Sequence, residues 1–93
     1  MPFYVYILQS LADNSFYKGF SEQPFVRLDH HNNGEATYTS NKRPWKIIYI
    51  EELETKKEAL IREKSLKKYS KAQIEQLIIS SKNIISQFGS SIG

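Results

Sequence analysis

The sequence predicts an α+β fold in which a small three-stranded antiparallel sheet is flanked by three helices. Two short runs of aromatic and β-branched residues stand near the start and a third in the middle, and helix-capping patterns follow. The 93 residues contain no internal linker, so we expect one small core. The predicted domain covers residues 1–86, with a disordered tail over residues 87–93 and a shallow surface site.

The first two strands form a predicted hairpin. Phe3–Gln9 is too short for a stable helix and leads to the polar turn Ala12–Ser15, after which Phe16–Phe20 returns as its partner. Side chains alternate between the two faces of a strand, so Tyr6 and Tyr17 become neighbours if the register aligns their faces.

A helix is predicted from about Pro24 to Asn32, because proline is tolerated in the first turn and Gly34 lies just beyond the end. Arg27 and His31 are four residues apart and therefore stand one above the other on one helix face. The polar stretch Glu35–Arg43 has no helical or strand periodicity, so a loop is predicted there.

The second half of the chain supplies the third strand and two more helices. Trp45–Ile50 follows a proline and has the composition of a strand, with its tryptophan as a core anchor. The capping box Thr55–Glu58 opens a helix to about Lys68, and a second box, Ser70–Gln73, opens a helix that should end near Ile85.

Charge and composition restrict the class of protein. The net charge is only +3, but Lys56–Lys71 has seven Lys or Arg against two Glu, which favours a polyanion such as nucleic acid. A solvated helix face would have the same composition. The chain has no cysteine and no apolar run near the roughly 18 residues that cross a bilayer, so we expect a cytoplasmic protein without membrane contact.

Five side chains are candidates for chemistry on a phosphodiester: Tyr6, Tyr17, Arg27, His31 and Glu63. Two phenols, a guanidinium, an imidazole and a carboxylate are the groups needed to activate water, hold a phosphate and bind one hard metal ion. Each also has a structural explanation, because tyrosines pack in hairpins, arginines cover helix surfaces and histidines are often buried.

Glu63 has support of its own. It lies within or beside the apolar stripe of its predicted helix, which is an awkward place for a purely solvated carboxylate. The competing explanation is an ion pair with Lys67, four residues on, worth roughly 0.2–0.5 kcal/mol. Glu58 and Arg62 offer the same pairing and are the better example of it.

The ordered motifs resemble the GIY-YIG nuclease family, most closely its small stand-alone bacterial branch, which is related to the nuclease domain of excision-repair proteins. The resemblance covers residues 3–69. The matching segments, in chain order, are Tyr4–Leu8, Phe16–Phe20, Arg27–Asn32, Thr39–Pro44 and Glu58–Lys68.

This resemblance implies a metal-dependent DNA endonuclease that acts in DNA repair or processing, with a single Mg²⁺ or Mn²⁺ site. Glu63 would hold the metal and Arg27 the scissile phosphate. Tyr6, Tyr17 and His31 would share the proton transfer from water, and either tyrosine could be the base. A free phenol has a pKa near ~10, so it acts as a base at neutral pH only if Arg27 or the metal favours the phenolate.

Further polar side chains are expected to follow the phosphate backbone of the nucleic acid, for which DNA is the expected partner. These side chains are Lys18, Tyr38, Lys42, Arg43, Lys64, Lys67 and Lys68. Phosphate contacts position a duplex but do not read its sequence. His30 is expected to take no part in the site, because adjacent residues on a helix point in different directions.

A nucleic-acid-binding module with weak or no catalysis is the main alternative. Family nucleases often gain affinity from an added binding domain, and this chain has room for none, so an unidentified protein partner would supply specificity. A protein-interaction domain is the third hypothesis, and it predicts no salt-sensitive binding of nucleic acid.

Overall fold

The computed structural model describes residues 2–89 and confirms the α+β class. In chain order the elements are β1 (Phe3–Ser10), β2 (Phe16–Ser21), α1 (Pro24–Asn32), the 3₁₀ turn η1 (Ser40–Lys42), β3 (Trp45–Leu53), α2 (Lys56–Leu66), α3 (Lys71–Ile78) and α4 (Ser86–Gly89). Among these elements there is no helix with the length and apolar character that crossing a membrane requires.

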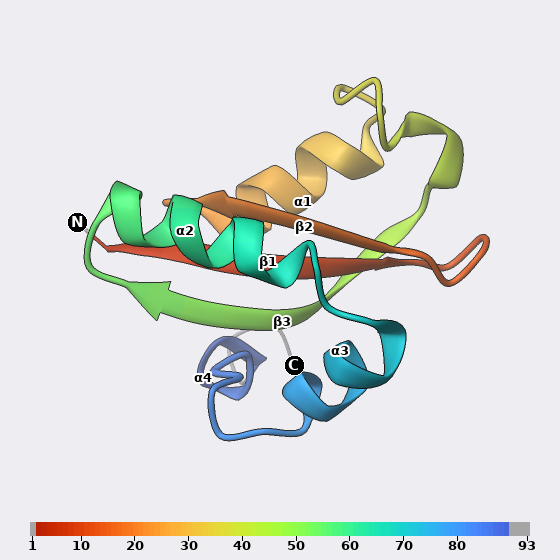
Figure 1. Ribbon diagram of the computed structural model, residues 1–93. Helices are drawn as coiled ribbons and strands as arrows, with labels where there is room; N and C mark the ends of the chain where they lie inside the picture. The colour runs from red at the N-terminus through yellow and green to blue at the C-terminus, as the bar shows by residue number, and fades with distance from the viewer. Residues whose placement is uncertain (1, 90–93) are drawn as a thin grey trace.

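The strand β1 is the centre of a three-stranded antiparallel sheet in the order β2-β1-β3 (Figure 1). The helices α1 and α2 lie on opposite sides of these strands (Figure 1). The consecutive residues Val5–Leu8 are therefore all buried, two on each face of β1. A strand buried on both faces has a continuous apolar sequence instead of a polar and apolar alternation, as β1 does.

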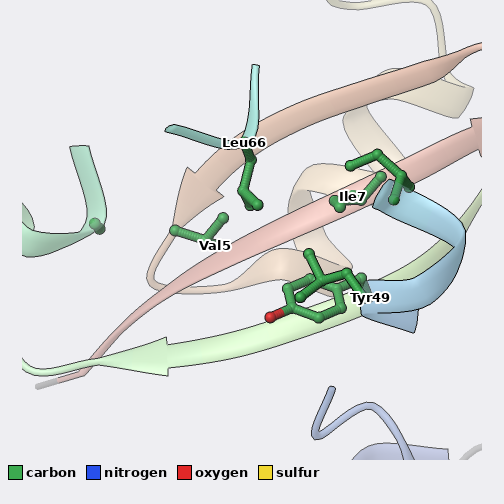
Figure 2. Packing of buried hydrophobic residues seen from close by; sticks show 7 residues of the cluster. Val5, Ile7, Tyr49 and Leu66 are labelled. Carbon is green, nitrogen blue, oxygen red and sulfur yellow. The ribbon is translucent and has the colours of Figure 1, made fainter. Parts of the chain in front are cut away.

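One face of the sheet packs against α2 and α3 and holds the larger core cluster. Val5, Ile7 and Tyr49 lie together with Leu66 of α2 (Figure 2), and Ile74 of α3 belongs to the same cluster. All five residues are fully buried. Burying an apolar side chain of this size contributes roughly 1.5–3 kcal/mol, so this face anchors both helices to the sheet.

The opposite face packs against α1 and is more polar. Tyr6, Leu8 and Trp45 form a second cluster, on which Leu28 of α1 is packed. Trp45 is the core anchor that its sequence position predicted, because it is 4% exposed and its indole N–H donates to the carbonyl of Thr39 at 3.0 Å. This face therefore combines apolar packing with the hydroxyl of a buried tyrosine.

The start of each long helix agrees with the sequence prediction. The helix α1 has the predicted bounds, with a proline in its first turn and Gly34 just after its end at φ 77°. Thr55 and Glu58 exchange both capping hydrogen bonds at the start of α2, and Ser70 and Gln73 do so at the start of α3. Local side-chain chemistry thus determines where these helices begin.

The prediction that the last long helix ends near Ile85 is wrong, because α3 already ends at Ile78. The Ser80 hydroxyl donates to the carbonyl of Leu77 at 2.7 Å, and the Asn83 amide donates to the carbonyl of Ile78 at 2.9 Å. Side-chain hydrogen bonds of this kind compete with the backbone bonds that would continue a helix.

Asn83 and Ile84 cover the outer edge of β3. The Asn83 amide donates to the carbonyl of Ile48 at 3.0 Å and accepts from the N–H of Ile50 at 3.2 Å. The N–H of Ile84 donates to the carbonyl of Ile50 at 2.9 Å. Within residues 2–89 no backbone hydrogen bond covers the outer edge of β2 in the same way, so β2 is the open edge of the sheet.

The short helix α4 occupies part of the expected tail. Residues 87–89 lie in α4, which differs from the disorder expected over residues 87–93, whereas residues 90–93 fall outside the described part of the chain. The Phe88 ring packs on Tyr4 and Phe25, with centroid distances of 5.8 and 5.7 Å. Aromatic packing therefore returns this segment to the face that carries α1.

Arg62 connects α2 to β3. Its Nε donates to Oε1 of Glu51 at 3.0 Å, its Nη1 donates to the hydroxyl of Tyr69 at 3.4 Å, and the hydroxyl of Tyr49 donates to the same oxygen of Glu51. The predicted pairing of Arg62 with Glu58 is wrong, because Glu58 caps α2 and Arg62 pairs with Glu51. This largely buried pair fixes α2 on the sheet.

The substitution Arg62→Met should destabilise the fold, because it keeps the apolar stem of the side chain and leaves Glu51, which is 18% exposed, without its cation. We expect a loss of about 2 kcal/mol in the free energy of unfolding, measured by urea denaturation. Lys82→Met, at an exposed lysine, is the matched control. Equal stability of the two variants would contradict this account of the pair.

Candidate active site

Four elements supply the five side chains that the sequence singled out. Tyr6 comes from β1, Tyr17 from β2, Arg27 and His31 from α1, and Glu63 from α2. Tyr6 and His31 are buried, and the other three are half-buried, so none of the five is a freely solvated side chain. Their mutual contacts and charges decide whether they can act together.

Tyr6 extends across β2 over Gly19. In the sheet register Tyr6 is paired with Gly19 and Leu8 with Tyr17, so the two tyrosines are diagonal neighbours on one face. A Cβ atom at Gly19 would lie 2.7 Å from the hydroxyl oxygen of Tyr6 and 3.1 Å from a ring carbon of Tyr17. Glycine therefore leaves the space that the Tyr6 phenol occupies.

A chain of polar contacts runs from Tyr6 through His31 to Thr39. Nδ1 of His31 lies 2.7 Å from Oγ1 of Thr39, and Nε2 lies 3.4 Å from the hydroxyl of Tyr6. The Thr39 hydroxyl donates to the carbonyl of Ala36 at 3.3 Å, so it accepts from Nδ1–H of His31. This tautomer leaves Nε2 as the acceptor for the Tyr6 hydroxyl.

Arg27 acts on both a phenol and a histidine. Its guanidinium lowers the pKa of Tyr6 against the effect of burial, and its Nη1 donates to Nδ1 of His30 at 3.3 Å. The expectation that His30 takes no part is therefore corrected, because His30 helps to orient the guanidinium. A guanidinium has five N–H donors, which is more than this contact uses.

Glu63 acts on the two tyrosines from the other side of the sheet. Its side chain is 14% exposed, and the expected pair with Lys67 is present, with 3.8 Å between Oε1 and Nζ. Charge-assisted hydrogen bonds are about 2.7–2.9 Å long, so Lys67 holds this carboxylate only loosely. The negative charge of Glu63 raises the pKa of both Tyr6 and Tyr17.

Burial decides the ionisation of the two phenols. Burial, the neighbouring Tyr17 and the charge of Glu63 raise the pKa of Tyr6 to about 12, although Arg27 opposes the rise. Burial and Glu63 also raise the pKa of Tyr17, again against Arg27. Both phenols are therefore neutral at pH 7, and Arg27 is not sufficient to favour the phenolate.

His31 is also neutral at pH 7. Burial lowers its pKa, and the nearby charges of Arg27 and His30 lower it further. The site thus places an uncharged imidazole with an acceptor nitrogen beside an uncharged phenol. Such a pair can accept a proton from a neighbouring group although the phenol has not first lost its own proton.

The carboxylate of Glu63 fits a metal site that is shared with substrate and water, and does not fit one that is enclosed by protein side chains. Among residues 2–89 no group of three or more His, Cys, Asp or Glu side chains could enclose a metal ion. Mg²⁺ typically binds through one or two carboxylates and completes its shell with waters and substrate phosphate oxygens. A single half-buried carboxylate fits that shared site and not a closed zinc or calcium site.

Three of the seven expected nucleic-acid contacts lie together beside Tyr17. Lys18, Tyr38 and Lys67 line a depression of about 490 Å³ together with Phe16 and Tyr17. Phe16, Tyr17 and Lys18 are consecutive residues of β2, so the depression lies along this strand, the open edge of the sheet. Cationic and aromatic side chains therefore border the candidate site on its exposed side.

The other four expected contacts have different surroundings. Lys42 forms an ion pair at 3.6 Å with an aspartate in the turn between β1 and β2, and Nε of Arg43 donates to the carbonyl of Ser40 at 2.8 Å. Lys64 and Lys68 are exposed, on α2 and just beyond its end, and do not line the depression. These four side chains therefore lie outside the depression.

Two further residues were given no role by the sequence-based prediction. Gly19 makes room for Tyr6, and Thr39 fixes the tautomer of His31. A glycine inside a strand often marks the close approach of another group, and this signal could have identified Gly19. Thr39 lies in the segment Thr39–Pro44 that resembles a family motif, but its contact with His31 depends on how the loop after α1 folds back on that helix.

The chain is similar to known proteins over most of its length. The family model of the GIY-YIG catalytic domain matches residues 2–77. A UPF0213 protein of Clostridium perfringens is 45% identical over 82 residues, which cover 87% of this chain and 86% of that protein. A UPF0213 protein of Staphylococcus aureus is 40% identical over 76 residues, which cover 81% and 92%. The solution NMR structure of the UPF0213 protein BH0048 from Bacillus halodurans has a TM-score of 0.57 and 29% identity, covering 95% and 94% of the two chains.

The substitution Gly19→Ala should destabilise the protein, because the added methyl group would collide with the buried phenol of Tyr6. Overpacking of this kind costs about 1–3 kcal/mol, which exceeds the gain from a less flexible unfolded chain. Urea denaturation would measure the change. In a protein that already carries Tyr6→Leu, the further substitution Gly19→Ala should lower the free energy of unfolding by less than it does in the wild type. If Gly19→Ala alone is as stable as the wild type, the collision is refuted.

The stability of the fold should fall as the pH is lowered from about 8 to about 5, in part because of His31. Its lowered pKa means that the unfolded chain binds a proton at a higher pH than the folded chain does, so protonation favours unfolding below about pH 6.5. His31→Gln should therefore show a shallower pH dependence of the free energy of unfolding. Identical slopes in the two proteins would show that His31 is not buried as a neutral group.

Proposed function

Because the chain belongs to the GIY-YIG catalytic-domain family, which is a family of nucleases, we propose that it is a metal-dependent endonuclease that hydrolyses phosphodiester bonds of DNA. The observation that carries this proposal is the buried contact between Tyr6 and His31, with the charges of Arg27 and Glu63 both acting on the same phenol. These groups come from three separate elements, and folding brings them together.

Arg27 is the residue that holds the scissile phosphate. Its planar fork can donate two parallel hydrogen bonds to phosphate oxygens, which a lysine cannot do. His30 fixes the guanidinium before the substrate arrives. Donors that are arranged in advance stabilise the charge that develops in the transition state, and one such donor can be worth roughly 3–4 kcal/mol.

Tyr6 and His31 provide the path for the proton of the attacking water. The neutral Tyr6 hydroxyl feels the charge of Arg27 and donates toward Nε2 of His31. When the hydroxyl takes a proton from water, it can pass its own proton to Nε2, so no free phenolate has to form first. Thr39 holds the imidazole in the tautomer that this transfer requires.

Glu63 is the residue that would hold a divalent ion, and GIY-YIG nucleases generally use such ions. The ion, Mg²⁺ or Mn²⁺, would supply positive charge that stabilises the leaving oxygen. Glu63 is suited to this role because its carboxylate is mostly shielded from solvent and only loosely paired with Lys67. DNA repair or processing is the setting that we propose, in the cytoplasm and with a protein partner that adds specificity.

The substitutions Glu63→Gln and Arg27→Ala should each reduce cleavage by roughly 10²–10³-fold while changing DNA affinity far less, because both remove groups that act mainly in the transition state. The assay incubates branched, nicked, single-stranded and duplex DNA with Mg²⁺ and quantifies the products. Glu75→Gln, at an exposed carboxylate of α3, is the matched control and should cleave as the wild type does.

Equal cleavage by wild type and Glu63→Gln, once contaminating nuclease is excluded, would refute the proposed mechanism. Salt-sensitive DNA binding without metal-dependent cleavage of any substrate would instead support the non-catalytic binding module. The absence of any salt-sensitive binding would support a protein-interaction domain.

A further inference from the structure

Tyr38 stands at the rim of the depression beside β2. Its side chain is 80% exposed, more than any other large apolar side chain in the described part of the chain. Single exposed aromatic residues are common on protein surfaces, so exposure alone assigns no role. What matters is that the exposed ring is next to an anchored residue and borders a depression that is also lined by lysines.

The residue that follows Tyr38 fixes its position. Thr39 is fully buried, its Oγ1 contacts Nδ1 of His31 at 2.7 Å, and its carbonyl accepts from the indole of Trp45 at 3.0 Å. The loop is therefore anchored immediately beside an exposed ring. An aromatic side chain on an anchored backbone loses less conformational entropy when a ligand stacks on it than one on a free loop does.

Tyr17 and two lysines surround the same space. The Tyr17 and Tyr38 rings have a centroid distance of 6.2 Å and are tilted by 44°, so they form an open aromatic corner. Lys18 and Lys67 line the depression as well. Its volume of about 490 Å³ lies within the range of roughly 300–1,000 Å³ that is typical of small-ligand pockets.

This combination fits an unstacked base better than it fits an intact duplex. In a duplex the faces of the bases are covered by their neighbours, and only edges and phosphates are accessible. An exposed aromatic ring offers a face on which any base can stack, and adjacent lysines can hold the flanking phosphates. Phosphate contacts alone would use the lysines and the hydroxyl of Tyr38 but would give no role to the exposed face of its ring.

We propose that the depression lined by Tyr17, Lys18, Tyr38 and Lys67 binds one unstacked nucleobase of a DNA strand, with the base stacked on Tyr38. This inference rests on the proposed function, because the bound nucleotide would adjoin the phosphate held by Arg27. The substrate class is therefore DNA with an unpaired nucleotide at the cleavage step, such as a single strand, a flap or a bulge. The role of Tyr38 is to recognise a base face, in addition to the backbone contact expected from its sequence position.

The test compares two probes that differ only in their bases. A short poly-dT strand and a strand of equal length made of abasic tetrahydrofuran nucleotides carry the same phosphates, and their affinities are measured in EDTA, where metal-dependent cleavage cannot occur. The wild type should bind poly-dT more tightly by roughly 5- to 150-fold, the equivalent of ~1–3 kcal/mol for one stacked base.

Substitution of the ring should remove this preference without removing phosphate binding. Tyr38→Ala should bind the two strands about equally and keep the same dependence of affinity on salt, because the number of neutralised phosphates is unchanged. Tyr38→Phe should retain the preference. Ile79→Ala, at a residue that is 77% exposed on another part of the surface, is the control and should behave as the wild type does.

Equal affinity of the wild type for both strands, or an unchanged preference in Tyr38→Ala, would overturn the inference. Either result would leave the nuclease proposal intact if Glu63-dependent cleavage is observed. Conversely, a Tyr38-dependent preference for bases, found without any cleavage, would support the inference and count against the nuclease mechanism. Because the Tyr38 side chain is exposed, its variants should fold normally, which circular dichroism would verify.

Discussion

The burial of β1 on both faces is the constraint on which the rest of the molecule depends. Alternation sends Val5 and Ile7 toward α2 and α3, and Tyr6 and Leu8 toward α1. The first pair lies in an apolar core that holds the helices. The second pair brings a hydroxyl into the layer beneath α1, where polar groups must find partners because water cannot reach them. One strand thus separates a face that stabilises the fold from a face that can carry chemistry.

The polar partners on the second face follow from that requirement. The Tyr6 hydroxyl contacts His31 and feels the charge of Arg27, and His31 is completed by Thr39. Burial keeps the phenol and the imidazole uncharged, whereas charged groups occur at the rim, where Glu63 and the lysines are partly solvated. The open edge of β2 lies between these two zones, since the edge of β3 is covered by the chain near Asn83. The depression beside β2 therefore gives the polar network a border of exposed cationic and aromatic side chains.

Much of the fold could be predicted from local sequence because its signals are local. The two capping boxes and the proline and glycine around α1 depend on groups a few residues apart, and these helix starts were predicted correctly. The end of α3 was not, because Ser80 and Asn83 redirect the chain through contacts that helical periodicity does not register. Arg62 was assigned to Glu58 on spacing, yet it pairs with Glu51 of β3, a partner that only the packing of α2 on the sheet supplies.

By itself the sequence determined the class of fold, the starts of the helices and the inventory of candidate groups for phosphodiester chemistry, since composition and short-range patterns specify these. That β1 is buried on both faces became clear only from the packing of the helices. Tertiary structure alone decided how those groups are placed and charged. It put Tyr6 over Gly19, made His30 a partner of Arg27, gave His31 its tautomer through Thr39 and grouped three of the seven expected nucleic-acid contacts beside Tyr17. Distances between residues that are remote in the chain, and the burial that shifts a pKa, exist only once the chain has folded.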